Sequence, residues 1–197
     1  MKQRKRIIKL ILLGIVGVLV TIVYVHQYKV VNQRVKAAPV KEYSMGEEVE
    51  MGQDILMNYT MEGYSVCVNQ AEVLTYEEFL KKYNAEDEYT YVPDKIYDVE
   101  ITLRNKNADE ETGINLSEFY VQGSAVSASI DTNLLSQVNP KLQGASAIAL
   151  RKDSSVTIHM PFALYRDYFR KDVWEDLNDF NMNFVATLYP TKKVIHL

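Results

Sequence analysis

One cysteine and one histidine of this sequence have the side-chain types that nucleophilic catalysis requires. Cys67 lies in the segment Tyr-Ser-Val-Cys-Val and His159 in the segment Thr-Ile-His-Met. A thiol beside an imidazole base can act as a nucleophile. Apolar and polar residues alternate around both positions, so Cys67 is expected on the strand face opposite Val66 and Val68. The pattern favours a small strand residue and an exposed or hydrogen-bonded strand histidine over a catalytic pair.

The segment Asn107–Glu118 has the spacing of oxygen ligands in a calcium-binding loop. Carboxylate or amide residues occupy positions 1, 3, 5 and 12 of the loop count and an apolar residue occupies position 8, namely Asn107, Asp109, Glu111, Glu118 and Ile114. Position 6 is Thr112 where calcium loops have glycine, Gly113 comes one residue late, and a strand is expected before the segment. An acidic, solvated loop between two strands explains the same residues. Calcium binding therefore stays an open hypothesis.

Tyrosine is the third residue type of chemical interest, because twelve of the fourteen tyrosines follow residue 36. Tyrosine offers a large amphipathic contact area at low entropic cost, which suits recognition of proteins, peptides or sugars. The alternative is that these rings cover the sheet faces of the domain itself. The densest group is Tyr83, Tyr89, Tyr91 and Tyr97, with the acidic residues Glu86, Asp87 and Glu88 among them.

Other signatures of catalysis or cofactor binding are missing from the sequence. It has no phosphate-binding glycine loop, no Gly-x-Ser-x-Gly elbow and no His-Glu pair of a zinc protease. A single Cys cannot form an internal disulfide, and three histidines, including His26 and His196, do not suit a histidine-rich metal site. The 26 acidic residues leave a carboxylate pair for sugar hydrolysis as an open alternative. We therefore assign no catalytic, cofactor-binding or metal-binding residue and expect no cofactor.

The charge is divided unevenly along the chain. Residues 1–36 hold eight of the 22 Lys and Arg residues and no Asp or Glu. The remaining residues hold 14 basic and 26 acidic side chains, which gives a formal charge of −12. Nucleic-acid phosphates require neutralisation by Lys and Arg, so we expect no nucleic acid as a partner of the acidic part.

The basic part contains an apolar run, Ile7–Val25, with Lys9 as its only charged residue. Nineteen helical residues rise about 28 Å, close to the roughly 30 Å of a bilayer's hydrocarbon core. Lys9 can reach the interface from its place near one end, and Tyr24 and Tyr28 fit an aromatic belt at the other. A cleaved signal peptide is the alternative, although the run is longer than a usual signal core. We predict an uncleaved membrane anchor.

The basic residues around this run also predict its orientation. Five Lys or Arg residues precede or begin the run and four follow it closely, a small excess that favours a cytoplasmic N-terminus under the positive-inside rule. The predicted organisation is a cytoplasmic basic tail (1–6), a transmembrane helix (7–25), a polar stalk (26–39) and an extracytoplasmic β-sandwich domain (40–197).

Alternation of apolar and polar residues dominates after residue 40 and predicts a β-rich domain. In the clearest strand, Ile96–Arg104, the residues from Tyr97 to Leu103 at odd positions face the core, and those from Asp98 to Arg104 at even positions face outward. The other predicted strands are Gly63–Val68, Ser155–Phe162 and Asn183–Tyr189, and, with weaker patterns, Asp54–Tyr59, Leu116–Gln122, Ala145–Leu150 and Lys193–Leu197.

Three short helices are predicted between the strands. The first begins at Thr75, which forms a capping box with Glu78. The second runs from an Asp131 cap to Val138, and the third covers about Tyr165–Asp179 with Trp174 off its apolar stripe. Many short strands with small helical insertions indicate an antiparallel two-sheet sandwich.

Four segments, in order along the chain, together resemble a known type of domain. They are Tyr43–Val49, Tyr97–Asn105, Leu116–Gln122 and Ala149–Phe162. They are similar to uncharacterised immunoglobulin-like domains of N-terminally membrane-anchored proteins of Gram-positive bacteria, although Ser154-Ser155 replaces the glycine usual before the last strand. The resemblance implies a mainly β fold, an antiparallel immunoglobulin-like β-sandwich with short helical insertions preceded by one transmembrane helix, located outside the membrane. It implies no catalytic residue.

We therefore expect a membrane-anchored binding module rather than an enzyme. Its membrane contact would be the N-terminal helix, and its ligand an envelope protein, a peptide or a cell-wall glycan. Two alternatives stay open: a cell-envelope hydrolase that uses carboxylates or Cys67, and an accessory subunit of a membrane transport or signalling complex.

Overall fold

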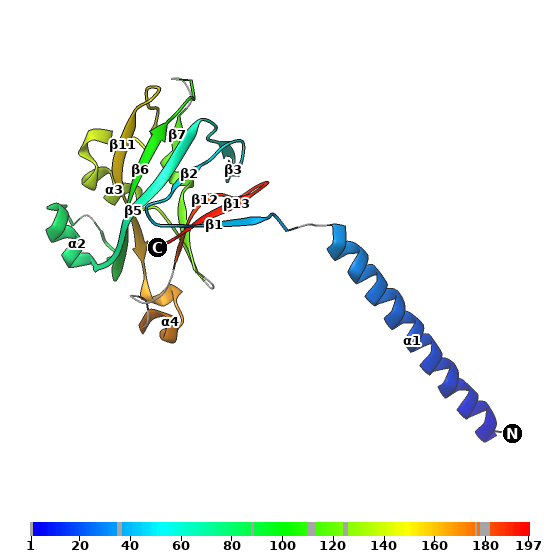
Figure 1. The fold of residues 1–197 in the computed structure, drawn as a ribbon. Helices are drawn as coiled ribbons and strands as arrows, with labels where there is room; N and C mark the ends of the chain where they lie inside the picture. Colours follow the sequence, from blue (N-terminus) through cyan, green and yellow to red (C-terminus); the bar gives the residue numbers. More distant parts are fainter. Residues whose placement is uncertain are drawn as a thin grey trace. The chain divides into compact units, whose positions relative to one another are not determined.

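The computed structural model describes residues 2–34, 37–87, 89–109, 113–123, 126–175, 177 and 182–197. The chain separates into two compact units, Met1–Ala37 and Ala38–Leu197 (Figure 1). The boundary lies two residues before the predicted start of the β-rich domain.

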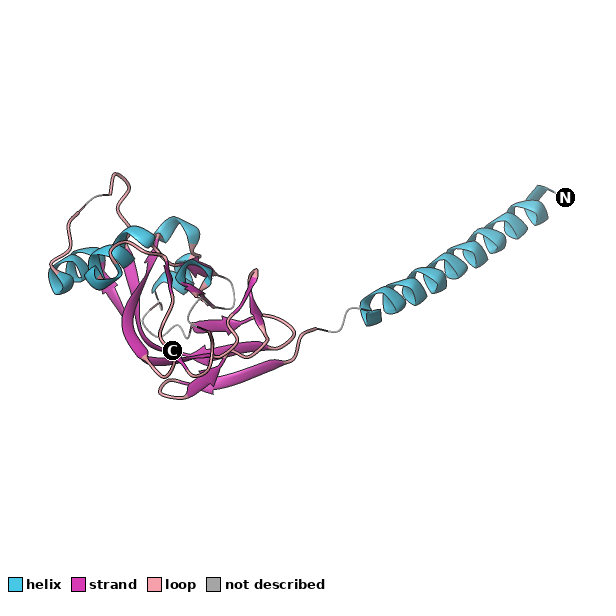
Figure 2. Cartoon of the chain, turned by 90° about the horizontal axis from the view of Figure 1, so that it is seen from above, coloured by secondary structure: helices cyan, strands magenta, loops and turns pink. Residues whose placement is uncertain are grey.

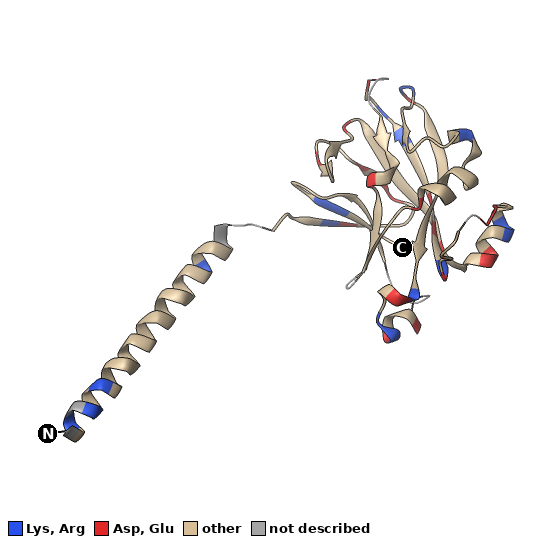
Figure 3. Ribbon diagram, turned by 180° about the vertical axis from the view of Figure 1, so that it is seen from behind, with Lys and Arg blue, Asp and Glu red and all other residues tan. Residues whose placement is uncertain are grey.

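The first unit is one helix, α1 (Lys2–Arg34). Its segment Arg6–Asn32 is long and apolar enough to cross a membrane, with a mean hydropathy of 2.7 in its most apolar window and no burial inside the protein. The lysines and arginines of α1 gather toward its N-terminal end (Figure 3). The helix continues through most of the predicted stalk, because no Gly or Pro follows Gly17 until Pro39.

The second unit is a β-sandwich of two main sheets with strand orders β1-β13-β12-β8-β9 and β11-β6-β5-β2. Two short ladders, β10-β7 and β3-β4, complete it. The strands of the five-stranded sheet are β1 (Val40–Ser44), β8 (Tyr120–Gln122), β9 (Ser127–Ser129), β12 (Asn183–Thr187) and β13 (Lys192–His196). Those of the four-stranded sheet are β2 (Glu48–Glu50), β5 (Tyr64–Thr75), β6 (Lys95–Asn105) and β11 (Ser155–Leu164). The short ladders are formed by β3 (Ile55–Leu56), β4 (Tyr59–Thr60), β7 (Ile114–Asn115) and β10 (Ala147–Ile148).

The main core lies between the two sheets. The odd-numbered residues of β6 from Tyr97 to Leu103 are buried there, as the alternation predicts, together with inward-facing residues of β5, β11 and β12. Phe119 and Phe184 stack with ring centroids 5.1 Å apart near the centre of this core. The predicted mainly β sandwich is therefore confirmed.

One pair of strands differs from the predicted antiparallel arrangement. β1 pairs with β13 in parallel, with Val40 aligned with Lys192 and Ser44 with His196, whereas the other ladders are antiparallel. The five-stranded sheet is thus mixed. Alternation along a strand indicates which residues face the core but carries no information on the direction of the neighbouring strand.

Two helices, α2 (Tyr76–Tyr83) and α3 (Thr132–Val138), pack on the outer side of the four-stranded sheet (Figure 2). The capping box of Thr75 and Glu78 and the Asp131 cap are both present, so these two predictions are confirmed. A second apolar cluster forms beneath the helices from Tyr76, Phe79, Ile96 and Leu134.

The predicted helix over Tyr165–Asp179 is wrong as a single element. The structure has a 3-10 turn, η3 (Arg166–Tyr168), and a short helix, α4 (Lys171–Glu175), separated by Phe169 in an extended conformation. Phe169 and Trp174 pack against each other, with ring centroids 5.3 Å apart, and against the main core. This pairing holds the turn and the helix as two separate pieces. Residues 176 and 178–181 lie outside the described residues.

Two local contacts join loops of the sandwich. Gly63 has a φ of +85° and lies so close to the loop after β6 that a β-carbon there would be 2.4 Å from the backbone nitrogen of Ala108. Lys193 extends from β13 to Asp54, where Nζ lies 2.7 Å from a carboxylate oxygen, and it also donates to the carbonyls of Glu50 and Met51.

Candidate functional site

The structure does not bring Cys67 and His159 together. Cys67 on β5 is aligned with Thr102 on β6, and Thr102 with Thr157 on β11, whereas His159 lies two residues farther along β11. With strands about 4.8 Å apart and residues about 3.4 Å apart, the two α-carbons are separated by about 12 Å. Cys67 is half-buried on the face opposite the buried Val66, as predicted, and burial raises the pKa of its thiol. The register separates the proposed nucleophile from its base.

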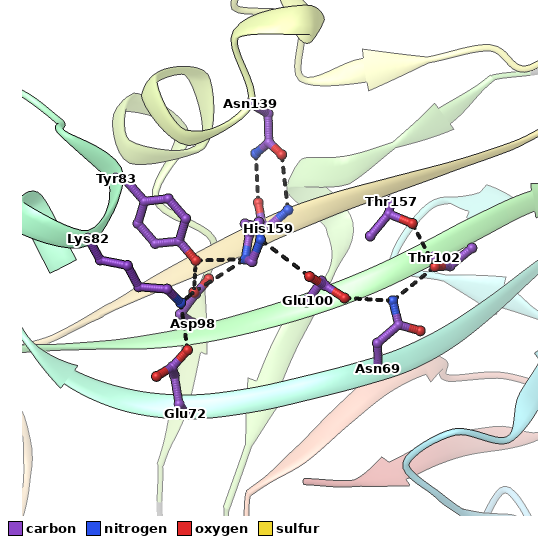
Figure 4. A network of polar contacts seen from close by, with 10 residues as sticks. All are labelled: Asn69, Glu72, Lys82, Tyr83, Asp98, Glu100, Thr102, Asn139, Thr157 and His159. Atoms are coloured by element: carbon purple, nitrogen blue, oxygen red, sulfur yellow. Dashed lines mark hydrogen bonds and ion pairs between the residues drawn. The ribbon is translucent and has the colours of Figure 1, made fainter.

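His159 instead belongs to a polar network on the outer face of the four-stranded sheet (Figure 4). Its Nδ1 lies 2.8 Å from the hydroxyl of Tyr83 and 3.3 Å from Oδ2 of Asp98. The Tyr83 hydroxyl donates to the same Asp98 oxygen, and Nζ of Lys82 lies 3.2 Å from it. Three side chains from α2 and β11 therefore converge on one carboxylate of β6.

Asp98 is the buried centre of this network. Its side chain is 1% exposed. Burial by itself would raise the pKa of the Asp98 carboxyl, but hydrogen bonds from His159 and Tyr83 and the charge of Lys82 outweigh burial and lower that pKa. Alternation predicted an outward-facing Asp98, and the direction is correct; the side chain is buried because α2 lies over this end of the sheet.

The backbone and the ring of His159 are both held by polar contacts. The backbone N–H of His159 donates to Oδ1 of Asn139, and its carbonyl accepts from Nδ2 of the same side chain, at 3.0 and 2.7 Å. The outward ring nitrogen faces a carboxylate oxygen of Glu100 at 3.4 Å. A general base needs a nucleophile at that nitrogen. The prediction of a hydrogen-bonded strand histidine is confirmed, and the network joins α2 to the sheet.

The calcium hypothesis is only partly covered by the structure, because Glu111 lies outside the described residues. The second half of the predicted loop is regular structure: Ile114 is buried in β7, and Leu116–Glu118 form the 3-10 turn η1. The Asn115 side chain accepts from Ser117 N and so caps this turn. In the described ranges, no group of three or more His, Cys, Asp or Glu residues is placed to hold a metal ion.

The tyrosines divide into buried and exposed groups. Tyr64, Tyr76 and Tyr97 are buried, so part of the tyrosine content covers the domain's own faces. Tyr91 and Tyr168, in contrast, are 59% and 75% exposed. Some tyrosines therefore cover the domain's own faces, whereas others are exposed to solvent.

The exposed rings of Tyr91 and Tyr168 and the half-buried ring of Tyr165 form a continuous feature, here called the aromatic surface (Tyr91, Tyr165 and Tyr168). Tyr91 and Tyr165 stack with centroids 5.1 Å apart and planes 12° from parallel. Tyr165 and Tyr168 meet edge to face at 5.7 Å. The Tyr91 hydroxyl donates to Oδ2 of Asp167 at 3.2 Å. Residues from the loop before β6 and from the turn after β11 therefore present one aromatic patch to solvent.

A pocket of about 190 Å³, here called the edge pocket, adjoins the aromatic surface. It lies between β9 and the end of β11, which are the last strands of their sheets. Ile130, directly after β9, and Phe162 of β11 form an isolated bridge. The walls of the pocket beyond that bridge are Val126–Ser129, Ala163–Tyr165, Tyr168 and Phe169. The pocket is mainly apolar with an aromatic rim. The sequence pattern indicates tyrosine clustering but places Tyr165 and Tyr168 in a predicted helix, not in that cluster.

Comparison with known protein families identifies the family of this chain. Residues 40–193 match a domain of unknown function, DUF5028. The chain belongs to the DUF5028 family. The DUF5028 domain begins at β1 and ends within β13, and it therefore includes both main sheets, the polar network and the aromatic surface. This confirms the predicted membership of an uncharacterised domain family.

Comparisons with individual proteins are less informative than the family match. None of the curated proteins matches the DUF5028 chain. Its structure is similar to the crystal structure of an uncharacterized β-sandwich protein from Clostridium difficile 630, with a TM-score of 0.42 and 11% sequence identity. The similarity covers 83% of this chain and 97% of that chain.

Proposed function

We propose that this protein is a single-pass membrane protein whose DUF5028 domain lies outside the membrane and acts as a binding module. Its ligand would be an envelope protein, a peptide or a cell-wall glycan, and the domain would act without catalysis and without nucleic acid. An immunoglobulin-like fold and a Gram-positive envelope, both implied by the sequence resemblance, are part of the same proposal.

The membrane half of the proposal is supported by α1. Its candidate span, Arg6–Asn32, has 27 residues and no part of its apolar window is buried within the protein. Twenty apolar helical residues suffice to cross a bilayer, and apolar side chains left uncovered need a lipid or protein environment. The basic residues at the N-terminal end favour the cytoplasm for that end.

The binding half is carried by one observation, the aromatic surface beside the edge pocket. Neighbouring exposed tyrosines suit a binding surface, because such rings contribute strongly at interfaces. The positions of the catalytic candidates support binding rather than catalysis, because Cys67 and His159 are separated and the outward nitrogen of His159 faces Glu100.

Thiol labelling tests the topology. In a Cys67→Ala background, Lys152→Cys places a thiol on an exposed turn of the domain, and Gln3→Cys places one before the candidate span. A membrane-impermeant maleimide added to intact cells is expected to label Lys152→Cys and not Gln3→Cys. The reverse pattern, or labelling of Lys152→Cys only after lysis, would refute an external domain.

Photo-crosslinking tests the binding role. A photo-reactive amino acid replacing Tyr168 is expected to form an adduct with an envelope component in intact cells. Tyr59, which is 53% exposed on β4, is the matched control position and is expected to form none. Equal adducts at both positions, or none at either, would contradict a binding role for the aromatic surface.

A further inference from the structure

We propose that the aromatic surface and the edge pocket bind a basic peptide segment, with a Lys or Arg side chain on the tyrosine rings and a neighbouring large apolar side chain in the pocket. This inference rests on the proposed binding function and specifies its ligand class. It is carried by three features: uncompensated carboxylates, exposed ring faces, and a pocket of side-chain size.

Three carboxylates surround the aromatic rings, and each accepts hydrogen bonds from neutral donors. Asp167 accepts from the Tyr91 hydroxyl, Asp94 from the backbone N–H of Arg166 at 2.8 Å, and Asp131 from the Tyr89 hydroxyl and the first turn of α3. Within the described part of the chain, none of the three forms an ion pair with Lys or Arg. Each negative charge is therefore available to a cationic ligand.

The nearby cations are mostly engaged elsewhere. Arg170 pairs with Asp172, Nζ of Lys171 lies 3.7 Å from Glu175, and Nζ of Lys95 sits 5.2 Å from the centre of the Trp174 ring. The Arg166 side chain is exposed on η3 and only partly offsets the three carboxylates. The local charge is negative, in line with the −12 of the acidic part of the chain.

The nearby carboxylates also affect the pKa values of the tyrosine hydroxyls. The carboxylate of Asp167 is the main cause that raises the pKa of the Tyr91 hydroxyl, and Asp94 adds to it. For Tyr165, burial comes first and the charge of Asp131 second, and both raise the pKa. A cation over a tyrosine face gains from the ring quadrupole, by about 0.5–2 kcal/mol depending on exposure. Carboxylates beside the rings strengthen that attraction.

The edge pocket supplies the apolar contact. A cavity of about 150 Å³ accommodates a benzene molecule, so about 190 Å³ suits one large apolar side chain. Because the pocket opens between two end strands, a ligand in extended conformation can follow β9 while alternate side chains point into the pocket and onto the rings. A glycan would also stack on tyrosine, but it would use neither the apolar pocket nor the negative charge.

Binding of a defined peptide to the full chain tests this inference. The probe is a fluorescent, capped peptide Lys-Lys-Leu-Lys-Lys, and the protein is held in an uncharged maltoside detergent, with protein-free micelles as the blank. Tyr168→Ala is expected to weaken binding about 2- to 30-fold, which corresponds to a loss of about 0.5–2 kcal/mol. Asp167→Asn is expected to weaken it by up to about 5-fold. The matched controls, Tyr59→Ala and Glu47→Gln, are expected to bind as the unaltered protein does.

Two altered probes separate the contributions. Replacing the leucine of the peptide by glycine is expected to weaken binding through the pocket, and replacing the lysines by glutamates is expected to abolish it. Equal binding by all protein variants would show unspecific attraction to an acidic domain and overturn the inference. Binding of an N-acetylglucosamine oligosaccharide that depends on Tyr168, without peptide binding, would also overturn it while leaving the proposed binding function intact. Binding of neither probe overturns the inference, whereas the labelling and crosslinking results decide the proposed function separately.

Discussion

Replacing Asp98 by Asn should destabilise the domain far more than the same substitution at an exposed position. The substitution keeps the shape of the side chain and removes the negative charge that Lys82, Tyr83 and His159 share. Removing one member of a buried charged group costs about 3–5 kcal/mol. Lys82 keeps its contact with Glu72 at 2.6 Å, so we expect the lower end, about 3 kcal/mol.

The assay is urea unfolding of the full chain in uncharged detergent at pH 7, followed by the fluorescence of Trp174, the only tryptophan. In thermal unfolding of the same samples, a loss of about 3 kcal/mol corresponds to a fall of about 6–12 °C in melting temperature for a domain of this size. The control is Asp172→Asn, which breaks an ion pair whose side chains are 60% and 74% exposed and should therefore have a much smaller effect on stability than Asp98→Asn. If Asp98→Asn and Asp172→Asn have equal effects, the argument for a buried charged centre is wrong.

The effect of Asp98→Asn on stability should also depend on pH. The pKa of Asp98 is lower in the folded protein than its ordinary value, so ionised Asp98 favours the folded state. This contribution is fully present above the pKa of the unfolded carboxyl, about 3.9, and is lost as the pH falls through the folded pKa. The stability difference between the unaltered protein and Asp98→Asn should therefore be constant near neutral pH and shrink below about pH 4.

Three further substitutions test local features by the same unfolding assay. Thr75→Ala removes the capping box of α2 and should cost about 1 kcal/mol; no loss would mean that packing alone fixes the helix start. Gly63→Ala places a β-carbon 2.4 Å from a backbone nitrogen and should cost more than about 2 kcal/mol, whereas Gly144→Ala, with a similar φ of +78° and open space, should cost about 1 kcal/mol. Lys193→Met removes the ion pair of the Asp54 carboxylate, which is 13% exposed and keeps its hydrogen bond from Thr191 N, and should cost about 3 kcal/mol; a neutral result would show that water solvates that carboxylate.

Local patterns predicted those features whose cause is local. The capping box at Thr75, the Asp131 cap and the inward face of Ile96–Arg104 all follow from residues within one element, and all are found. The alternation around Cys67 and His159 likewise predicted which way each side chain points.

Features that depend on a second element could not be read in this way. Asp98 is polar and faces outward, and only the packing of α2 over it makes it a buried centre. The break at Phe169 depends on its contact with Trp174 and the core, against a helical pattern in the sequence. The parallel pairing of β1 depends on β13, since Val40 and Ser44 pair with Lys192 and His196, each 152 residues farther along the chain.

The edge of β11 shows how the domain limits unwanted self-association. An end strand with free backbone groups can pair with the same strand of another molecule. At His159 the side-chain amide of Asn139 takes both backbone groups and so acts as a substitute neighbour, and Pro161 has no backbone N–H to offer. Copies confined to a membrane plane, as proposed above, meet each other at high local density. Asn139 therefore blocks the pairing of another strand with β11 at His159.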